Sequence, residues 1–290
     1  MMDAIKAEWV QLVEEASKLC ELPTFLPANF IWETFIPKVV YTAIALLIIF
    51  FLVLNSFDRV AAGKVDPANK YKVCYQFTNF CFNVCIGCVG LYLEYGFLAK
   101  QPIYHARSMN KVAGLEYELY LPAALQLGYQ IFAMPIGIYY KTETSTMLLH
   151  HVAVIFSSVL SGIFSLGFRY YIPFFLGIFE LSSIPLAVVN LFKDNPSLAK
   201  VYPRINLICR LSFALSFLAI RWYMDLFRMP IYLRDNFIVF YTLEIGFAKF
   251  YLLFQFLAAA FLTFLQIYWG LLVSKGMYKF LKGGKKSKKA

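Results

Sequence analysis

The chain has 290 residues, of which 60% are hydrophobic and 15% are charged, and its formal net charge is +10. Soluble domains are roughly 45–50% apolar and about 25% charged, so this composition excludes an ordinary soluble domain and predicts a polytopic membrane protein. The positive charge gathers in the last residues, KGGKKSKKA, rather than on a folded basic surface with aromatic side chains, which excludes a nucleic-acid-binding protein.

The N-terminal segment comes before the first apolar stretch. It reads MMDAIKAEWVQLVEEASKLCELP, which is acidic and lacks the apolar core of a secretory signal peptide. Residues 2–19 predict an amphipathic helix with acidic residues opposite one apolar face. That face consists of Ile5, Trp9, Val13 and Ala16. Such a helix lies flat at a membrane interface or packs on a protein partner.

Seven later stretches each provide the roughly 20 apolar residues that a spanning helix needs. They are residues 35–56, 73–98, 118–140, 146–166, 169–192, 205–227 and 248–274. The sequence therefore predicts an all-α protein with seven transmembrane helices. Residues 231–247 are apolar but contain Asp235 and Glu244, so we expect them to form a re-entrant or interfacial segment.

Four cysteines of the second span share one helical face. They are Cys74, Cys81, Cys85 and Cys88, with no histidine or carboxylate between them. Metal sites usually gather their ligands from turns or from separate elements. We therefore interpret the cysteines as small residues that let helices approach closely, and predict no metal; a metal site is the alternative.

The fourth span begins with the segment TSTMLLHHVAVIF, residues 144–156, which contains His150 and His151. Ionisable groups inside a span usually face the interior of a helix bundle or a water-filled cavity. A polar strip continues along the same span through Ser157, Ser158, Ser161 and Ser165. The histidines are either a structural pair bonded to neighbouring helices or part of an acid–base site.

Further polar groups occur in the later spans. The fifth span has Glu180 and Ser183, and the sixth has Arg210, Arg221 and Asp225. Arg221 and Asp225 are four residues apart, so we expect them to pair on one helix face. The acid–base site would be complete if Glu180 and Arg210 lay in the same bundle core as the histidines.

In this order, the motifs resemble the TLC-domain family, which includes the ceramide synthases. The matching segments are LHH, ELSSIP, ICRLSFALSFLAIRW and LQIYWGLLVSKGMYKFLK. The resemblance is closest to the branch outside the ceramide synthases, although the proline of ELSSIP falls one residue later than in the pattern of that branch. It implies a bundle of six helices around a cavity that takes a lipid chain, with the second to seventh spans forming the bundle and the first lying outside.

The resemblance also implies a division of the chain. Residues 1–33 form the amphipathic segment, 34–67 the first transmembrane helix and its loop, 68–282 the TLC domain, and 283–290 the basic tail.

The candidate lipid-binding residues are His150, His151, Ser157, Glu180, Ser183, Arg210 and Trp269. Ceramide synthases carry two aspartates, three residues apart, on the span after their histidine pair. This chain has Glu180 and Ser183 at the matching positions, so the second carboxylate is missing. In an enzyme, His150, His151 and Glu180 would be the catalytic groups, and acyl-CoA would be the substrate.

Three functions follow. The first is a protein of lipid homeostasis that binds or handles a membrane lipid or acyl chain in its cavity. The second is an acyl-CoA-dependent acyltransferase that resembles ceramide synthase. The third is a lipid-binding structural subunit of a larger membrane complex, with a protein partner on the N-terminal amphipathic segment. No cofactor is predicted, and no nucleic acid.

The Lys and Arg residues at the helix ends predict a cytosolic C-terminus, because more of them lie on the side of the membrane that carries the C-terminus than on the opposite side. Lys286 and Lys288 resemble the K-x-K-x-x signal that retrieves proteins to the endoplasmic reticulum. We therefore expect the endoplasmic reticulum membrane; a mitochondrial membrane is the alternative.

Overall fold

The computed structural model describes residues 10–11, 13–14, 17, 25–60, 65–101, 109–112, 117–244 and 246–286. Within this part of the chain, seven helical segments are long and apolar enough to cross a membrane. They are Ala28–Arg59, Pro67–Lys100, Tyr117–Tyr139, Ser145–Ile163, Arg169–Asp194, Pro203–Thr242 and Phe247–Lys279. The predicted all-α polytopic fold with seven spans is confirmed.

The α-helices, in chain order, are α2 (Ala28–Phe30), α3 (Ile36–Val60), α4 (Lys70–Leu91), α6 (Leu121–Tyr139), α7 (Ser145–Ile163), α8 (Ser183–Asp194), α9 (Pro196–Val201), α10 (Pro203–Ser216), α11 (Asp225–Thr242) and α12 (Phe247–Lys286). Four π-helical segments interrupt or extend them: Ile31–Phe35, Tyr92–Phe97, Pro173–Gly177 and Phe217–Met224. The 3₁₀ segments are Pro67–Asn69, Leu98–Lys100, Met109–Val112, Tyr117–Tyr120, Arg169–Tyr171 and Ile178–Ser182.

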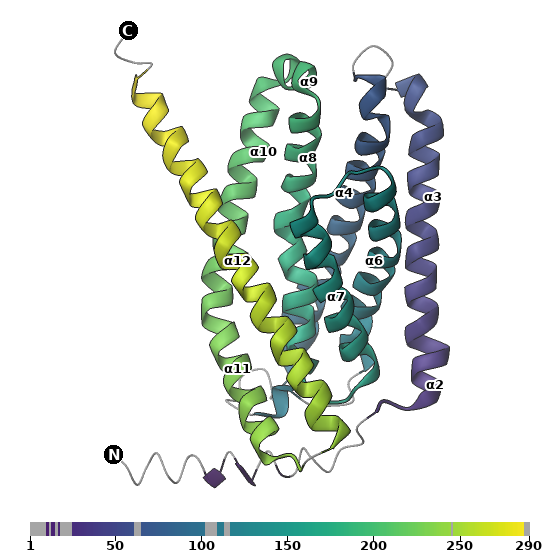
Figure 1. Cartoon of the computed structure of the whole chain (residues 1–290), viewed down its shortest axis with the longest axis vertical. Coiled ribbons are helices and arrows are strands. Elements are labelled where there is room, and N and C mark those ends of the chain that lie inside the picture. The colour runs from purple at the N-terminus through teal and green to yellow at the C-terminus, as the bar shows by residue number, and fades with distance from the viewer. Residues whose placement is uncertain are drawn as a thin grey trace.

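The first span lies at the edge of the bundle, where α3 packs against α6 and α4 (Figure 1). Gly128 of α6 allows this contact, because a Cβ atom there would lie 2.5 Å from the carbonyl oxygen of Val39. The other six spans form the bundle, and α12 crosses it at an angle before its C-terminal half leans outward (Figure 1).

The second and fifth spans approach each other through glycines. A Cβ atom on Gly90 would lie 2.6 Å from the backbone nitrogen of Ile178 and 2.8 Å from the Cα atom of Gly177. Of the four cysteines of α4 that we expected to allow close packing, Cys74 is buried, but Cys85 and Cys88 are exposed. Glycine makes the contact instead, because any side chain would hold the two backbones apart.

The expectation of a re-entrant segment after the sixth span is wrong. Helix α10, the π-helical segment and α11 follow one another without a break from Pro203 to Thr242. Of the two acids that suggested an interfacial segment, Asp235 is buried and pairs with Arg234 at 2.7 Å, and Glu244 is exposed beyond the end of α11. Arg228 of the same span forms a partly buried ion pair with Glu94 of the second span.

Two predicted features fall largely outside the described residues. The amphipathic helix at residues 2–19 is one, since only positions 10–11, 13–14 and 17 of it are described. The retrieval signal is the other: Lys286 ends α12, and Lys288 lies beyond the described part.

Candidate functional site

A cavity of about 340 Å³ lies among the second to seventh spans. None of its described lining residues comes from α3, in agreement with the expectation that the first span stays outside. The cavity extends to the end of the bundle where α8 ends and α6 joins α7, which is also the end towards which α12 runs (Figure 1). Its wall contains both histidines, Glu180 and Arg221.

The fifth span is irregular where it meets this cavity. A π-helical turn at Pro173–Gly177 leads into the 3₁₀ segment Ile178–Ser182, and the regular helix α8 begins only afterwards. Such irregular backbone leaves carbonyl oxygens that need donors from elsewhere. The Nε2 atom of Gln126 donates to the carbonyl oxygen of Leu176 at 3.3 Å, and the Nε atom of Arg221 donates to that of Phe179 at 3.2 Å.

Arg221 is the buried cation of the site. It lies in the π-helical segment Phe217–Met224, where its guanidinium reaches the fifth span. Its Nη2 atom is 3.3 Å from Oε2 of Glu180 and 2.9 Å from Oγ of Ser183, and its Nε atom is 2.7 Å from Oγ of Ser182. An ion pair out of water is stable only with such additional hydrogen bonds.

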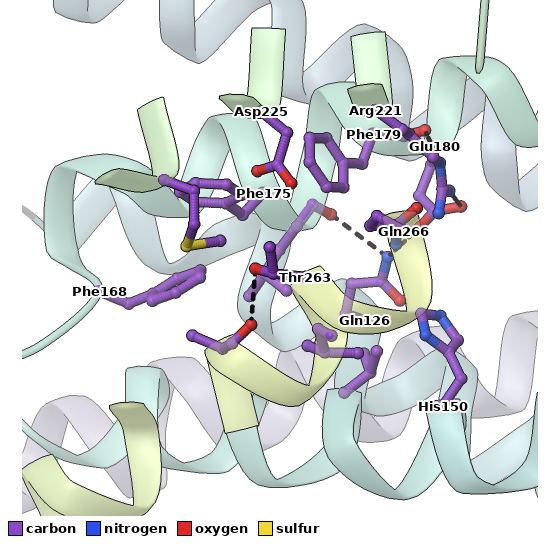
Figure 2. A pocket seen from close by; sticks show the side chains of 15 residues that line it. Gln126, His150, Phe168, Phe175, Phe179, Glu180, Arg221, Asp225, Thr263 and Gln266 are labelled. Carbon is purple, nitrogen blue, oxygen red and sulfur yellow. Dashed lines mark hydrogen bonds and ion pairs between the residues drawn. The ribbon is translucent and has the colours of Figure 1, made fainter. Parts of the chain in front are cut away.

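Two glutamines extend this network across the bundle. Gln126 donates to Oε1 of Glu180 at 3.3 Å, and Gln130 donates to Oε1 of Gln126, also at 3.3 Å. Figure 2 shows Gln126 pointing towards Glu180. Glu180 is therefore held from two sides, by a cation and by an amide.

The histidines lie in the cavity wall on α7. The ring centroid of His150 is 5.4 Å from that of Trp269 on α12, and the ring of His151 is 6.2 Å from that of Tyr129 on α6. His151 is only 3% exposed. In the described structure, neither of its ring nitrogens has a hydrogen-bond partner, and neither does Nδ1 of His150. Buried polar groups are normally hydrogen-bonded, so these nitrogens are free to bind a ligand.

A second, smaller pocket of about 40 Å³ adjoins the cavity. Gln126, His150, Glu180 and Arg221 line both spaces, and the rest of the smaller one is mostly apolar, with three phenylalanine rings among its lining (Figure 2). Asp225 also faces this pocket and is 4% exposed.

The expected ion pair of Arg221 with Asp225 is not formed among the described residues. Arg221 pairs with Glu180, and Oδ1 of Asp225 has no hydrogen-bond partner there. The fifth span offers Arg221 a carboxylate, two hydroxyls and a carbonyl together, which outweighs a single carboxylate on its own helix. Asp225 instead lines the smaller pocket from the sixth span, together with His150 and Glu180.

The structure brings most of the predicted site residues together. The two histidines, Glu180, Ser183 and Trp269 all line the cavity. Ser157 is buried but is not part of its lining, since it packs further along α7.

The prediction that Arg210 belongs to the site is wrong. It is exposed on α10, where its Nε atom donates to Asn206 at 2.9 Å. The arginine of the site is Arg221, eleven residues later on the same span. One sequence could not distinguish them, because both lie in the motif ICRLSFALSFLAIRW.

Sequence reasoning also missed the amides of the cavity. They are Gln76, Asn79 and Asn83 on α4, Gln126 and Gln130 on α6, and Asn190 on α8. The spacing of the first three residues, at positions i, i+3 and i+7, places them on one helix face and could have found them.

The mouth of the cavity carries its own charges. Burial raises the pKa of Glu143, the nearby hydroxyl of Tyr75 partly offsets this shift, and the charge of Asp194 adds to it. Lys193 is the exposed cation beside them. No group of three His, Cys, Asp or Glu side chains with the arrangement of a metal site occurs within the described residues.

The comparisons with known proteins give one match. The family model of the TLC domain matches residues 72–275. No curated protein and no solved structure matches the chain.

Proposed function

The chain therefore belongs to the TLC-domain family of membrane proteins, and we propose that it binds a membrane lipid in its central cavity. The observation that carries this proposal is a polar cavity of about 340 Å³ inside a bundle of apolar helices. Ligand cavities usually measure about 300–1,000 Å³ and hold a few well-placed polar groups.

The lining suggests how a lipid would lie. The headgroup would occupy the polar part, near the histidines and the ion pair of Arg221 with Glu180. Leu272 lines the cavity from α12 and is 50% exposed. The lipid chains would therefore leave past α12 into the bilayer, since the adjoining pocket of about 40 Å³ is too small for an acyl chain.

A second candidate function is acyl transfer from acyl-CoA. It is favoured by His150, Glu180 and Asp225 lining one pocket, which supplies a base and two carboxyl groups. A neutral imidazole would accept the proton of an amine or hydroxyl as that group attacks the thioester carbonyl. The C–S bond then breaks, an amide or ester forms, and the proton passes to the leaving thiolate.

Replacing both His150 and His151 with Ala distinguishes the two functions. We expect the variant to remain folded and to copurify with less lipid, because its cavity loses the buried nitrogens that lack protein partners. Mass spectrometry of extracted lipid measures this change. An enzyme would in addition lose acyl transfer from radiolabelled acyl-CoA, whereas a binding protein shows no such activity before or after the change.

The matched control is Arg210→Ala, which removes a polar side chain outside the cavity. Its lipid content should equal that of the unaltered protein. An unchanged lipid content in the double histidine variant would contradict the assignment of the cavity.

For location, we propose the endoplasmic reticulum membrane with a cytosolic C-terminus. The support is the lysine pair Lys286 and Lys288 at the end of the chain. Replacing both with Ser should let a tagged protein escape to the Golgi or cell surface, as seen by fluorescence imaging. Replacing Lys275 and Lys279 with Ser removes the same charge and should leave the distribution unchanged. A mitochondrial pattern in all three proteins would refute the proposal.

A further inference from the structure

We infer that the cavity selects lipids with an uncharged polar group that carries hydroxyl or amide donors, and that it discriminates against the corresponding phosphate-bearing lipids. This inference rests on the proposed function and names the ligand class of the same site. Neutral acylglycerols and ceramides have this chemistry.

The first argument is the kind of polar group in the wall. Five buried amides face the cavity from two adjacent helices: Gln76, Asn79, Asn83, Gln126 and Gln130. A side-chain amide donates and accepts hydrogen bonds without carrying charge. Such a wall matches a ligand that also both donates and accepts, as a hydroxyl or an amide does.

The second argument concerns buried amide oxygens of the wall that accept no hydrogen bond from the described residues. Oδ1 of Asn79 and Oε1 of Gln130 are buried and have no hydrogen-bond partner among the described residues. Both are acceptors, so each needs a donor from the ligand. A hydroxyl supplies that donor, whereas a fully ionised phosphate in its place offers only acceptors and would leave these oxygens unpaired, which is costly in a buried site.

The third argument is charge. The acidic groups in the lining are Glu143, Glu180 and Asp194, and the basic groups are Lys193 and Arg221. The guanidinium of Arg221 already bonds four acceptors of the fifth span. Lys193 is exposed at the mouth, beside two of the acids. No excess of positive charge thus remains in this lining to compensate a phosphate group.

The test compares lipids that differ only by a phosphate. The full chain in detergent micelles is titrated with dioleoylglycerol and dioleoylphosphatidic acid, and with palmitoyl ceramide and its phosphate, and complexes are counted by native mass spectrometry. We expect the neutral member of at least one pair to bind about tenfold more tightly, as one unpaired buried polar group predicts.

Each outcome of this comparison either supports or overturns the inference. Preference within the glycerol pair or within the ceramide pair supports the inference and shows which backbone is read. Equal or tighter binding of both phosphate forms overturns the inference and leaves lipid binding intact. Binding of none of the four overturns the proposed function together with the inference.

A double variant, compared with a control, tests the amides directly. Replacing Asn79 and Gln130 with Leu should lower the affinity for the preferred neutral lipid about tenfold and leave that for its phosphate form unchanged. The control is Asn236→Leu, a buried amide of α11 outside the cavity lining. A loss that is equal for both lipid forms would argue against selection by the amides. The comparison of lipids on the unaltered protein does not depend on whether the variants fold.

Discussion

Replacing Arg221 with Met is expected to lower the free energy of unfolding by about 3–5 kcal/mol, because it leaves Glu180 without its cation in a nearly dry site. The side chains of Arg221 and Glu180 are only 7% and 16% exposed. The same change removes the donor to the carbonyl oxygen of Phe179 and to the hydroxyls of the fifth span. Unfolding in mixed detergent micelles, followed by circular dichroism, measures the loss.

A second change should restore much of this stability. Converting Glu180 to Gln in the Arg221→Met background removes the uncompensated charge and keeps an acceptor for Gln126. Arg210→Met is the control, since that arginine is exposed, and it should shift stability by less than about 0.5 kcal/mol. Equal losses for Arg221→Met and Arg210→Met would show that the buried ion pair is not what stabilises the fifth span.

The second large effect is expected at Gly90. Adding one methyl group there should cost well over 1–3 kcal/mol, the usual range for overpacking, because the atoms it meets belong to backbone. The nitrogen of Ile178 at 2.6 Å cannot turn aside as a flexible side chain would. The second and fifth spans must move apart, and Glu180 moves with them.

The comparison for this change is Gly276→Ala on α12, where a Cβ atom meets nothing within 4 Å. That substitution should be neutral or stabilise the helix by up to about 1 kcal/mol. Thermal unfolding and lipid content are measured for both variants. If Gly90→Ala unfolds at the same temperature as Gly276→Ala, the close contact of the two backbones is wrong.

The sequence predicted the number and order of spans well, because each is a long apolar run and length alone decides whether a helix can cross a bilayer. It failed at the sixth span. There Asp235 and Glu244 argued against a helix in the membrane, but the structure shows Asp235 paired with Arg234 inside a continuous helix and Glu244 beyond its end. Arg228 of the same span is paired with Glu94 of the second span. Pairing across helices leaves no local signal in a sequence.

The site was predicted only in part, because contacts between helices also leave no local signal. His150, His151 and Glu180 could be named because a polar group in an apolar run is conspicuous by itself. Which of two arginines faces them, and whether Asp225 pairs with its neighbour on the helix, depends on the π-helical turn at Phe217–Met224 and on the partners offered by the fifth span. The amides of α4 alternate with cysteines in one segment, and an uncharged amide is a weaker signal in an apolar run than a histidine or a glutamate.

Helix α12 is longer than the membrane is thick. Its forty residues extend about 60 Å, against roughly 30 Å of hydrocarbon. The apolar part ends near Lys279, and the helix then continues for about 10 Å to Lys286. Helix α12 thus acts as a rigid spacer that carries the backbone at Lys286 well past the end of its apolar part.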